Sequence, residues 1–242
     1  MIGVILAAGM AKRLRPLTDV CPKCLLKVGN KTLLARIVDA MRDAGCAEFV
    51  IVTGYKEEMI RQFMDEHYPQ LDVTFLDNTD YEQNNNIYSL WMAGKMVKGK
   101  EFLLMDSDIL CDPEAVKRIA VQSESALAMQ QHELGEEEMK VVVDEQGCIT
   151  QLTKGCNPTD AIGESVGIEK ITESYSRALF QELEVMIEHE ELINVFYELA
   201  FERLIPQGFT FKVVDVTDCF SMELDTPEDF ERAKELIPET LF

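Results

Sequence analysis

The stretch that decides the fold reads MIGVILAAGMAKRLRPLT, residues 1–18, and it continues as PKCLLKV, residues 22–28. Its start, Ile2–Leu6, is a continuous apolar run, which is typical of a strand buried on both faces of a parallel sheet. The small residues Ala7, Ala8 and Gly9 follow, and small residues let a ligand approach the backbone closely. Because free backbone N–H groups after a strand cradle phosphates, the sequence predicts a phosphate-binding loop here.

Basic residues gather beside this loop although the chain as a whole is acidic. The chain has 23 Lys and Arg against 44 Asp and Glu, a net charge of −21, which disfavours nucleic acid and anionic membranes as partners. Arg13 has a planar fork that suits bidentate phosphate contacts, and Lys23 adds a second charge; solvated surface cations beside a glycine turn are the alternative. Against the single acid Asp19, the basic residues of this segment are Lys12, Arg13, Arg15, Lys23, Lys27 and Lys31.

The first half of the chain alternates between strand and helix patterns. Helical spacing of apolar residues covers 32–44, 56–67 and 86–97, and short apolar runs mark strands at 49–52, 73–76 and 102–105. Such alternation predicts βαβ units and a Rossmann-like α/β fold with a mixed, mostly parallel central sheet flanked by helices. In such sheets ligands bind beyond the carboxyl ends of the strands.

The second half has a different pattern. Short strands are expected between 124 and 171, with a hairpin turn at 144–147, and they predict a small β-rich insertion. Beyond it the sequence predicts helices at 174–189, 193–204 and 227–236 and a strand at 209–216. We expect residues 1–242 to form a single domain.

The N-terminal stretch resembles the signature of the sugar-nucleotide pyrophosphorylase-like nucleotidyltransferase family, LAAGxGxRLxPLT followed by PKxLLxV. The likeness extends over nearly the whole chain, and it implies an Mg²⁺-dependent transfer of a nucleoside monophosphate from an NTP to a phosphorylated acceptor. It implies Arg13 and Lys23 as catalytic residues and Leu6, Ala7, Ala8 and Gly9 as nucleotide-binding residues. The family's second glycine and its small neighbour are replaced by Ala11-Lys12, and the Lys12 side chain either contacts the phosphates or faces solvent.

Two acidic motifs complete the expected cation site. The resemblance implies Asp108, in MDSD, as a magnesium ligand, with Asp106 beside the nucleotide; Asp112 is the better helix N-cap, so capping leaves both residues unexplained. It implies Asp225, in DTPED, as the second magnesium ligand, while Thr226 is expected to cap the last helix.

The segment NNNIYSL, residues 84–90, resembles the NN-x-YSL segment of phosphocholine cytidylyltransferases and of related enzymes that activate inositol phosphate or aminoethylphosphonate. Asn85 and Asn86 match that segment, and asparagine offers the donors and acceptors that reading a base edge needs. An ordinary N-cap with an amphipathic helix is the alternative. The resemblance favours CTP as the nucleotide.

Residues 144–168 resemble the family's acceptor-binding stretch, which implies that Lys154 contacts the acceptor phosphate and that Glu164 meets a cationic or hydroxyl group. Glu223 is also assigned to the acceptor. Where phosphocholine-activating members carry an aromatic residue in the choline pocket, this chain has Glu138-Met139-Lys140, so an acceptor without a quaternary ammonium stays open. The Glu-rich patch at 133–138 is expected to be a solvated face.

The predicted function is therefore cytidylyl transfer from CTP to phosphocholine, aminoethylphosphonate or a similar acceptor with release of pyrophosphate, in cell-surface polysaccharide or phosphonate biosynthesis. Residues 1–120 would bind the nucleotide and residues 121–242 the acceptor. A sugar-1-phosphate uridylyl- or thymidylyltransferase and a non-catalytic nucleotide-binding regulator are the alternatives. Without a signal or membrane-span pattern, a cytoplasmic location and reduced cysteines are expected; zinc at Cys21 and Cys24 is not, and a homodimer stays open.

Overall fold

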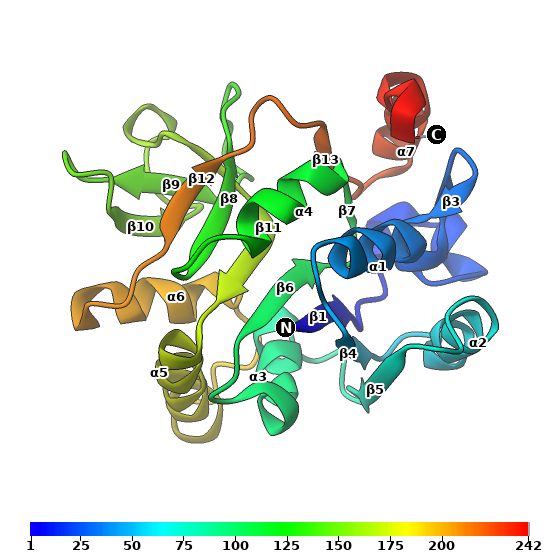
Figure 1. The fold of residues 1–242 in the computed structure, drawn as a ribbon, viewed down its shortest axis with the longest axis horizontal. Coiled ribbons are helices and arrows are strands. Elements are labelled where there is room, and N and C mark those ends of the chain that lie inside the picture. The colour runs from blue at the N-terminus through cyan, green and yellow to red at the C-terminus, as the bar shows by residue number, and fades with distance from the viewer. Residues whose placement is uncertain (242) are drawn as a thin grey trace.

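A nine-stranded mixed sheet forms the centre of the molecule (Figure 1), and the computed structural model describes residues 1–241. The main path of the sheet runs β10-β9-β11-β6-β1-β4-β5, and β8 pairs with both β11 and β12. The predicted apolar run becomes β1, which is buried along its whole length between two parallel neighbours. The four parallel strands of this part are β1 (Ile2–Ala7), β4 (Glu48–Thr53), β5 (Asp72–Asp77) and β6 (Phe102–Asp106).

Antiparallel pairing begins at β11, which lies beside β6 and continues the sheet into a β-rich part. This part contains β8 (Ala126–Gln130), β9 (Lys140–Val143), β10 (Ile149–Thr153) and β11 (Gly163–Ile171), and β12 (Lys212–Asp215) joins β8 in parallel. The predicted turn at 144–147 does connect β9 to β10, and Gly147 adopts the positive φ of +80° that favours glycine. The predicted α/β class with a mixed, mostly parallel sheet and a β-rich insertion is confirmed.

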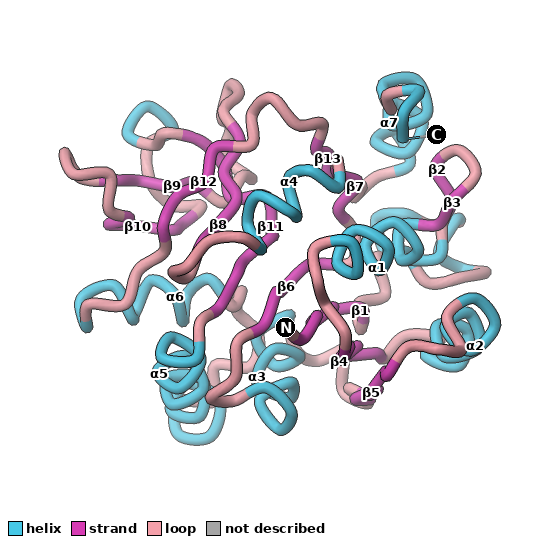
Figure 2. Tube along the Cα trace, in the orientation of Figure 1, coloured by secondary structure: helices cyan, strands magenta, loops and turns pink. Residues whose placement is uncertain are grey.

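Helices cover both faces of the sheet (Figure 2), and each face has its own apolar core. On one face lie α1 (Leu33–Asp43), α2 (Glu57–His67) and α4 (Pro113–Ala120). On the other lie α3 (Asn86–Val97), α5 (Glu173–Glu184), which continues as a π-helical turn over Val185–His189, and α6 (Glu198–Leu204). Short 3-10 turns occur at Lys12–Leu14, Leu17–Asp19, Lys23–Leu25, Pro158–Asp160, Ile205–Gln207 and Glu239–Leu241.

A third, smaller apolar cluster holds the C-terminal helix α7 (Pro227–Leu236) against the N-terminal segment. Phe230 of α7 shares this cluster with Leu14 and with Val28 of the hairpin formed by β2 (Lys27–Val28) and β3 (Lys31–Thr32). Packing therefore brings the two ends of the chain together. None of the helices within residues 1–241 has the length and apolar character that crossing a membrane needs.

The structure differs from the predicted elements at three places. The strands β7 (Ile109–Cys111) and β13 (Ser221–Glu223), which pair with each other, were not predicted, because each is too short to show an alternating pattern. The strand expected at 209–216 is shorter, and the helix expected at 193–204 begins only at Glu198. Two hydrogen bonds to the start of α3 explain the later helix start: Asn85 N donates to Ile193 O (2.9 Å), and Tyr197 N donates to Asn86 Oδ1 (3.0 Å).

Candidate functional site

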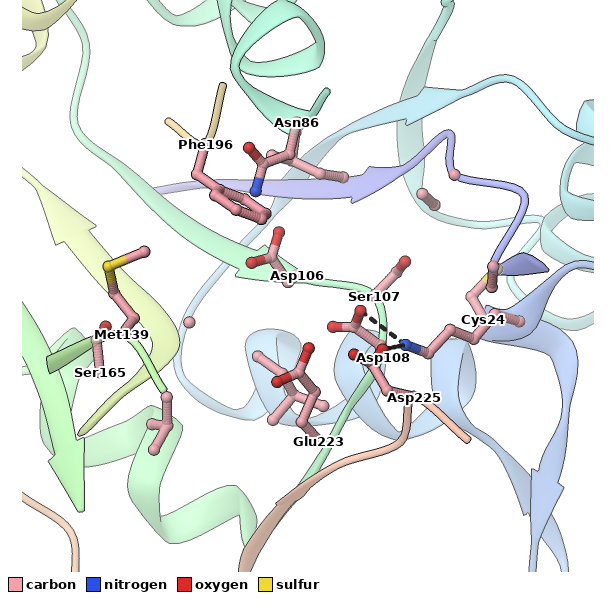
Figure 3. Close-up of a pocket in the computed structure, with 18 of the residues that line it drawn as sticks. Cys24, Asn86, Asp106, Ser107, Asp108, Met139, Ser165, Phe196, Glu223 and Asp225 are labelled. Carbon is pink, nitrogen blue, oxygen red and sulfur yellow. Dashed lines mark hydrogen bonds and ion pairs between the residues drawn. The ribbon is translucent and has the colours of Figure 1, made fainter. Parts of the chain in front are cut away.

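A cavity of about 830 Å³ lies beyond the carboxyl ends of β1 and β6 (Figure 3). Its volume is in the range of small-molecule sites, and parallel sheets place ligands at this edge. Every residue that the sequence assigned to the site lines this cavity. They are Leu6, Ala7, Ala8, Gly9, Arg13, Lys23, Asn85, Asn86, Asp106, Asp108, Lys154, Glu164, Glu223 and Asp225.

The loop after β1 forms one wall of the cavity. A side chain added at Gly9 would meet no atom within 4 Å, so the backbone here is open to a ligand. Ala11 has a φ of 49°, in the left-handed region, which explains why the family pattern carries a glycine at this position and costs alanine about 1–2 kcal/mol. Lys12 does not line the cavity; its side chain is 64% exposed, with Nζ 4.0 Å from Glu82 Oε2, so of the two alternatives it faces solvent.

The unpredicted ribbon of β7 and β13 assembles an acidic cluster. Its antiparallel register pairs Glu223 with Ile109, and Leu224 N donates to Asp108 O (3.2 Å). One carboxylate oxygen from each of Asp108, Glu223 and Asp225 therefore lies within 4.8 Å of the others, and Figure 3 shows the three side chains facing one another. Among residues 1–241 this is the one group of three or more acidic, histidine or cysteine side chains with metal-ligand spacing.

The cap of α7 leaves Asp225 free to take part in this cluster. Thr226 is the N-cap, as predicted, and it forms a reciprocal capping box with Asp229. Asp229 Oδ2 accepts from Asp225 N (3.1 Å) as well as from Thr226 N (2.8 Å), so the backbone before the helix is fixed. The Asp225 side chain is not needed for capping and points into the cavity.

Lys23 stands among these carboxylates with its side chain only 8% exposed. Its Nζ donates to Asp108 Oδ2 (2.9 Å) and to Asp225 Oδ1 (2.5 Å), and Arg13 pairs with the other oxygen of Asp225. Burial alone would lower the pKa of the Lys23 ammonium, but the two aspartates outweigh it and the pKa lies above its usual value. Burial would likewise raise the pKa of Asp225, yet Lys23 and Arg13 hold it below its usual value.

The remaining acids near this cluster lack such a cation. Desolvation by the walls of the cavity, then the charges of Asp108 and Asp225, raises the pKa of Glu223 to about 8. Burial, and next the charge of Asp108, raises the pKa of Asp106 well above its usual value. Asp106 Oδ2 accepts a hydrogen bond from Tyr197 Oη (3.1 Å), which fixes its side chain at the cavity wall.

The asparagine segment caps α3, which is the structural alternative weighed for it, and two of its side chains also line the cavity. Asn85 is the N-cap of α3, and its Oδ1 accepts from Asn86 N (2.7 Å), while Asn86 Oδ1 holds Tyr197 N. Asn84 pairs with the buried Asn78, so part of the triple asparagine is structural. The amide nitrogens of Asn85 and Asn86 donate no hydrogen bond within the described residues, and both side chains line the cavity.

The other end of the cavity is lined by β11, by residues just before β9 and just after β10, and by the segment before α6. Lys154 Nζ lies over the Phe196 ring, 4.7 Å from its centroid, and Glu164 Oε2 lies 2.7 Å from His132 Nε2. Glu137 and Glu138 also line the cavity, so the expectation of a merely solvated face at 133–138 holds only in part.

Sequence reasoning missed His132, Phe196, Tyr197 and Glu198 as cavity or near-cavity residues. The last three lie in a segment that its apolar spacing predicted as plain helix, and His132 follows β8 without any motif around it. The cysteines expected as reduced thiols are all free, and burial raises the pKa of Cys24 to about 12.

Residues 3–199 match the family model of the MobA-like NTP transferase domain. Among curated proteins, a bifunctional IPC transferase and DIPP synthase from Aquifex aeolicus (strain VF5) is 31% identical over 98% of this chain and 52% of its own length. A CMP-5'-(3-aminopropyl)phosphonate synthase from Streptomyces rubellomurinus (strain ATCC 31215) is 24% identical over 95% of this chain and 38% of its own length. This chain thus spans about half of the first relative and less of the second.

Solved structures show the same fold at low sequence identity. A CTP:phosphocholine cytidylyltransferase from Streptococcus pneumoniae superposes with a TM-score of 0.82 and 19% identity, covering 98% of this chain and 99% of that one. An inositol-1-phosphate CTP transferase from T. maritima superposes with a TM-score of 0.78 and 19% identity, covering 98% and 97% of the two chains.

Proposed function

This chain belongs to the MobA-like NTP transferase domain family, and on that premise we propose that it transfers CMP from CTP to a small phosphorylated or phosphonate acceptor, releasing pyrophosphate. One observation carries the proposal. Asp108, Glu223 and Asp225 converge on one side of the cavity, and Lys23 and Arg13 reach the same point from the N-terminal loop. A site with both charges can hold a divalent cation and a triphosphate together.

The three carboxylates fit a hard divalent cation, which prefers oxygen ligands. The Lys23 ammonium already bridges two of them, Asp108 and Asp225, with a positive charge. We assign Asp108, Asp225 and also Glu223, which the sequence assigned to the acceptor, to Mg²⁺, because one carboxylate oxygen of each lies within 4.8 Å of the others. When bound, Mg²⁺ would neutralise charge on the α-phosphate and on the acceptor oxygen.

The proposed reaction is attack of an acceptor phosphate or phosphonate oxygen on the α-phosphorus of CTP, while the bond to pyrophosphate breaks. The second pKa of a phosphate is about 6, so this oxygen is ionised at neutral pH and needs no general base. The protein's task is to position the reactants and to stabilise charge. Arg13 and Lys23 would neutralise the α-phosphate and the departing pyrophosphate, against the backbone of Leu6–Gly9.

The nucleotide base would lie beside α3. The amide nitrogens of Asn85 and Asn86 offer donors at the cavity wall, and Asp106 lies across from Asn86 (Figure 3). The Streptomyces relative and both structural neighbours are named for CMP or CTP, which supports cytidine over other bases. Lys154 would bind the acceptor's phosphate, with Glu164 facing the rest of the acceptor. Residues 1–120 would thus bind the nucleotide and residues 121–242 the acceptor.

A pyrophosphate-release screen tests this proposal. Four NTPs are each combined with phosphocholine, phosphoethanolamine, aminoethylphosphonate, inositol phosphate and hexose 1-phosphates, with and without Mg²⁺. Of the four nucleotides, we expect only CTP to support turnover, and only when Mg²⁺ is present. Turnover with UTP or dTTP and a hexose 1-phosphate would establish the sugar-nucleotide alternative. Binding of a nucleotide without release of pyrophosphate from any combination would support the alternative of a non-catalytic nucleotide-binding regulator. The cytoplasmic location, the homodimer and the biosynthetic pathway stay predictions.

A further inference from the structure

The end of the cavity lined by β11, Lys154 and the segment before α6 is called the acceptor end below. Two buried carboxyl groups near this end have unmet hydrogen-bonding capacity. Glu198, the first residue of α6, lines the cavity and is 8% exposed, and its Oε2 has no hydrogen-bond partner in the part of the chain that the structure describes. Behind it, Glu169 of β11 is 0% exposed, and neither of its carboxyl oxygens has a partner there. A buried polar group without a partner is destabilising, so a ligand that supplies donors to Glu198, the one of the two that lines the cavity, would gain by meeting it.

The cavity wall around Glu198 is rich in negative charge. Glu137, Glu138 and Glu164 line the same end of the cavity. Among the described residues that line the cavity, the arginines Arg13 and Arg232 and the lysine Lys23 belong to the end formed by the N-terminal loop and α7. Lys154 is the lysine of the acceptor end, and its Nζ lies over Phe196. The acceptor end thus presents one lysine, His132 paired with Glu164, and several further carboxyl groups.

From this arrangement we infer that the acceptor is a zwitterion, with a primary ammonium group bound by Glu198 and Glu164 and a phosphate or phosphonate bound by Lys154. The inference rests on the proposed function and names its substrate class. An ammonium group has three N–H donors and no acceptor, which matches the Glu198 oxygen that lacks a donor among the described residues. Its charge also offsets that of the surrounding acids, which a neutral hydroxyl group does not.

A trimethylammonium group fits this end less well. It has no N–H to donate, and its recognition depends on aromatic faces. The Tyr, Phe and Trp residues that line the cavity within residues 1–241 are Tyr81 and Phe196. Tyr81 packs edge-on against Tyr55 beside the N-terminal loop, and the face of Phe196 is covered by Lys154 Nζ. The acceptor end therefore lacks the aromatic cage that a quaternary ammonium needs.

Matched acceptors test the inference with CTP and Mg²⁺. Phosphoethanolamine is compared with ethylene glycol phosphate, which replaces the ammonium by a hydroxyl, and with phosphocholine, which methylates it. We expect kcat/KM for phosphoethanolamine to exceed that of either analogue by on the order of 10²-fold. Equal or better turnover of the hydroxyl or methylated analogue, or of inositol phosphate, would overturn the inference and leave the proposed function in place.

Two substitutions on α6 test whether Glu198 is the residue that binds the ammonium group. Glu198→Gln is expected to reduce the preference for phosphoethanolamine over ethylene glycol phosphate to less than about tenfold. Glu202→Gln, one turn further along α6 and outside the cavity, serves as the matched control and should keep the wild-type ratio. If Glu198→Gln fails to fold by circular dichroism, Glu164→Gln is expected to lower the same ratio; an unchanged ratio in a folded variant would contradict the assignment.

A calorimetric titration distinguishes failure of the proposed function from failure of the inference that the acceptor is a zwitterion. If no acceptor gives pyrophosphate with any nucleotide, the proposed function falls, and binding of phosphoethanolamine and of ethylene glycol phosphate to the wild-type protein then decides the inference. Binding of the ammonium compound at least about tenfold tighter supports a zwitterion subsite. Equal binding, or none of either compound, contradicts it.

Discussion

The two ends of the cavity hold their charges in opposite ways. At the phosphate end, which the N-terminal loop and α7 form, Lys23 and Arg13 are already paired with Asp108 and Asp225 before any ligand arrives. At the acceptor end, Glu198 lines the wall with an oxygen that no donor among the described residues reaches. A ligand at the phosphate end must therefore rearrange preformed ion pairs, while a ligand at the acceptor end can supply the donor that Glu198 lacks.

Removing a carboxylate from the phosphate end is expected to reduce activity most. Asp108→Asn removes one carboxylate of the proposed cation site, and turnover should fall by on the order of 10³-fold, because bound Mg²⁺ is worth several kcal/mol of charge stabilisation. The measurement is kcat in steady-state pyrophosphate release at saturating Mg²⁺. As a control, Asp112→Asn changes the N-cap of α4 by one atom and should retain activity. Loss of activity in the control alone would reverse the assignment.

A second change tests the cation that stands among these acids. Lys23→Ala should reduce the single-turnover rate by roughly 10²–10³-fold, by analogy with the loss of one preorganised transition-state donor. Lys27→Ala, on the exposed side of the β2–β3 hairpin, is the matched control and should retain the wild-type rate. A near-wild-type rate in Lys23→Ala would remove Lys23 from catalysis.

A third prediction concerns the acceptor end and the pH dependence of the free energy of unfolding. Burial, the leading cause, raises the pKa of Glu198 from 4.5 to about 7, so the folded protein holds a proton that the unfolded chain has lost. This group therefore lowers the free energy of unfolding as pH rises from 4.5 to about 7, by about 3 kcal/mol in total.

Glu198→Gln should lose this pH dependence. Urea unfolding at several pH values should show the variant gaining on the wild type as pH rises, with the difference levelling off above pH 7. The exposed Glu145 on the β9–β10 turn is the control, and Glu145→Gln should follow the wild-type profile. A constant difference between Glu198→Gln and wild type across this range would mean that Glu198 is not held as a buried acid.

The smallest expected effect concerns Lys12, the residue that departs from the family pattern. Its side chain faces solvent, and an exposed pair such as Lys12 with Glu82 contributes about 0–1 kcal/mol. Lys12→Ala should therefore change the KM for CTP by less than about twofold. A tenfold rise in that KM would show that the lysine reaches the phosphates, which would enlarge the phosphate end.

The sequence predicts the phosphate end better than the acceptor end, for a physical reason. Residues 6–28 supply the loop and both cations in one stretch, so a local motif carries the site, and the apolar run of β1 fixes its place at the sheet edge. Asp225 lies far away in sequence, yet its motif also serves to start α7, which made it visible. The main elements of the sheet were predictable for the same reason, since their apolar patterns are local.

Contacts between segments that lie far apart in the sequence could not be predicted from local patterns. The β7–β13 ribbon that brings Glu223 to Asp108 joins two strands too short to show a pattern, so the sequence does not place Glu223 beside Asp108 and Asp225, and its assignment to the acceptor stays a prediction. Likewise, Phe196 and Glu198 reach the cavity because Asn85 and Asn86 hold the backbone of residues 193–197 out of a helix. Such side-chain-to-backbone bonds between distant segments leave no local signal.

Crystals of the protein grown with CTP and Mn²⁺, measured near the manganese absorption edge, test most directly whether the acidic cluster binds a cation. We expect an anomalous peak among the carboxylates of Asp108, Glu223 and Asp225, with Lys23 Nζ turned from the acids toward the triphosphate. A manganese peak elsewhere, or a triphosphate bound while Lys23 keeps both of its aspartate contacts, would contradict it.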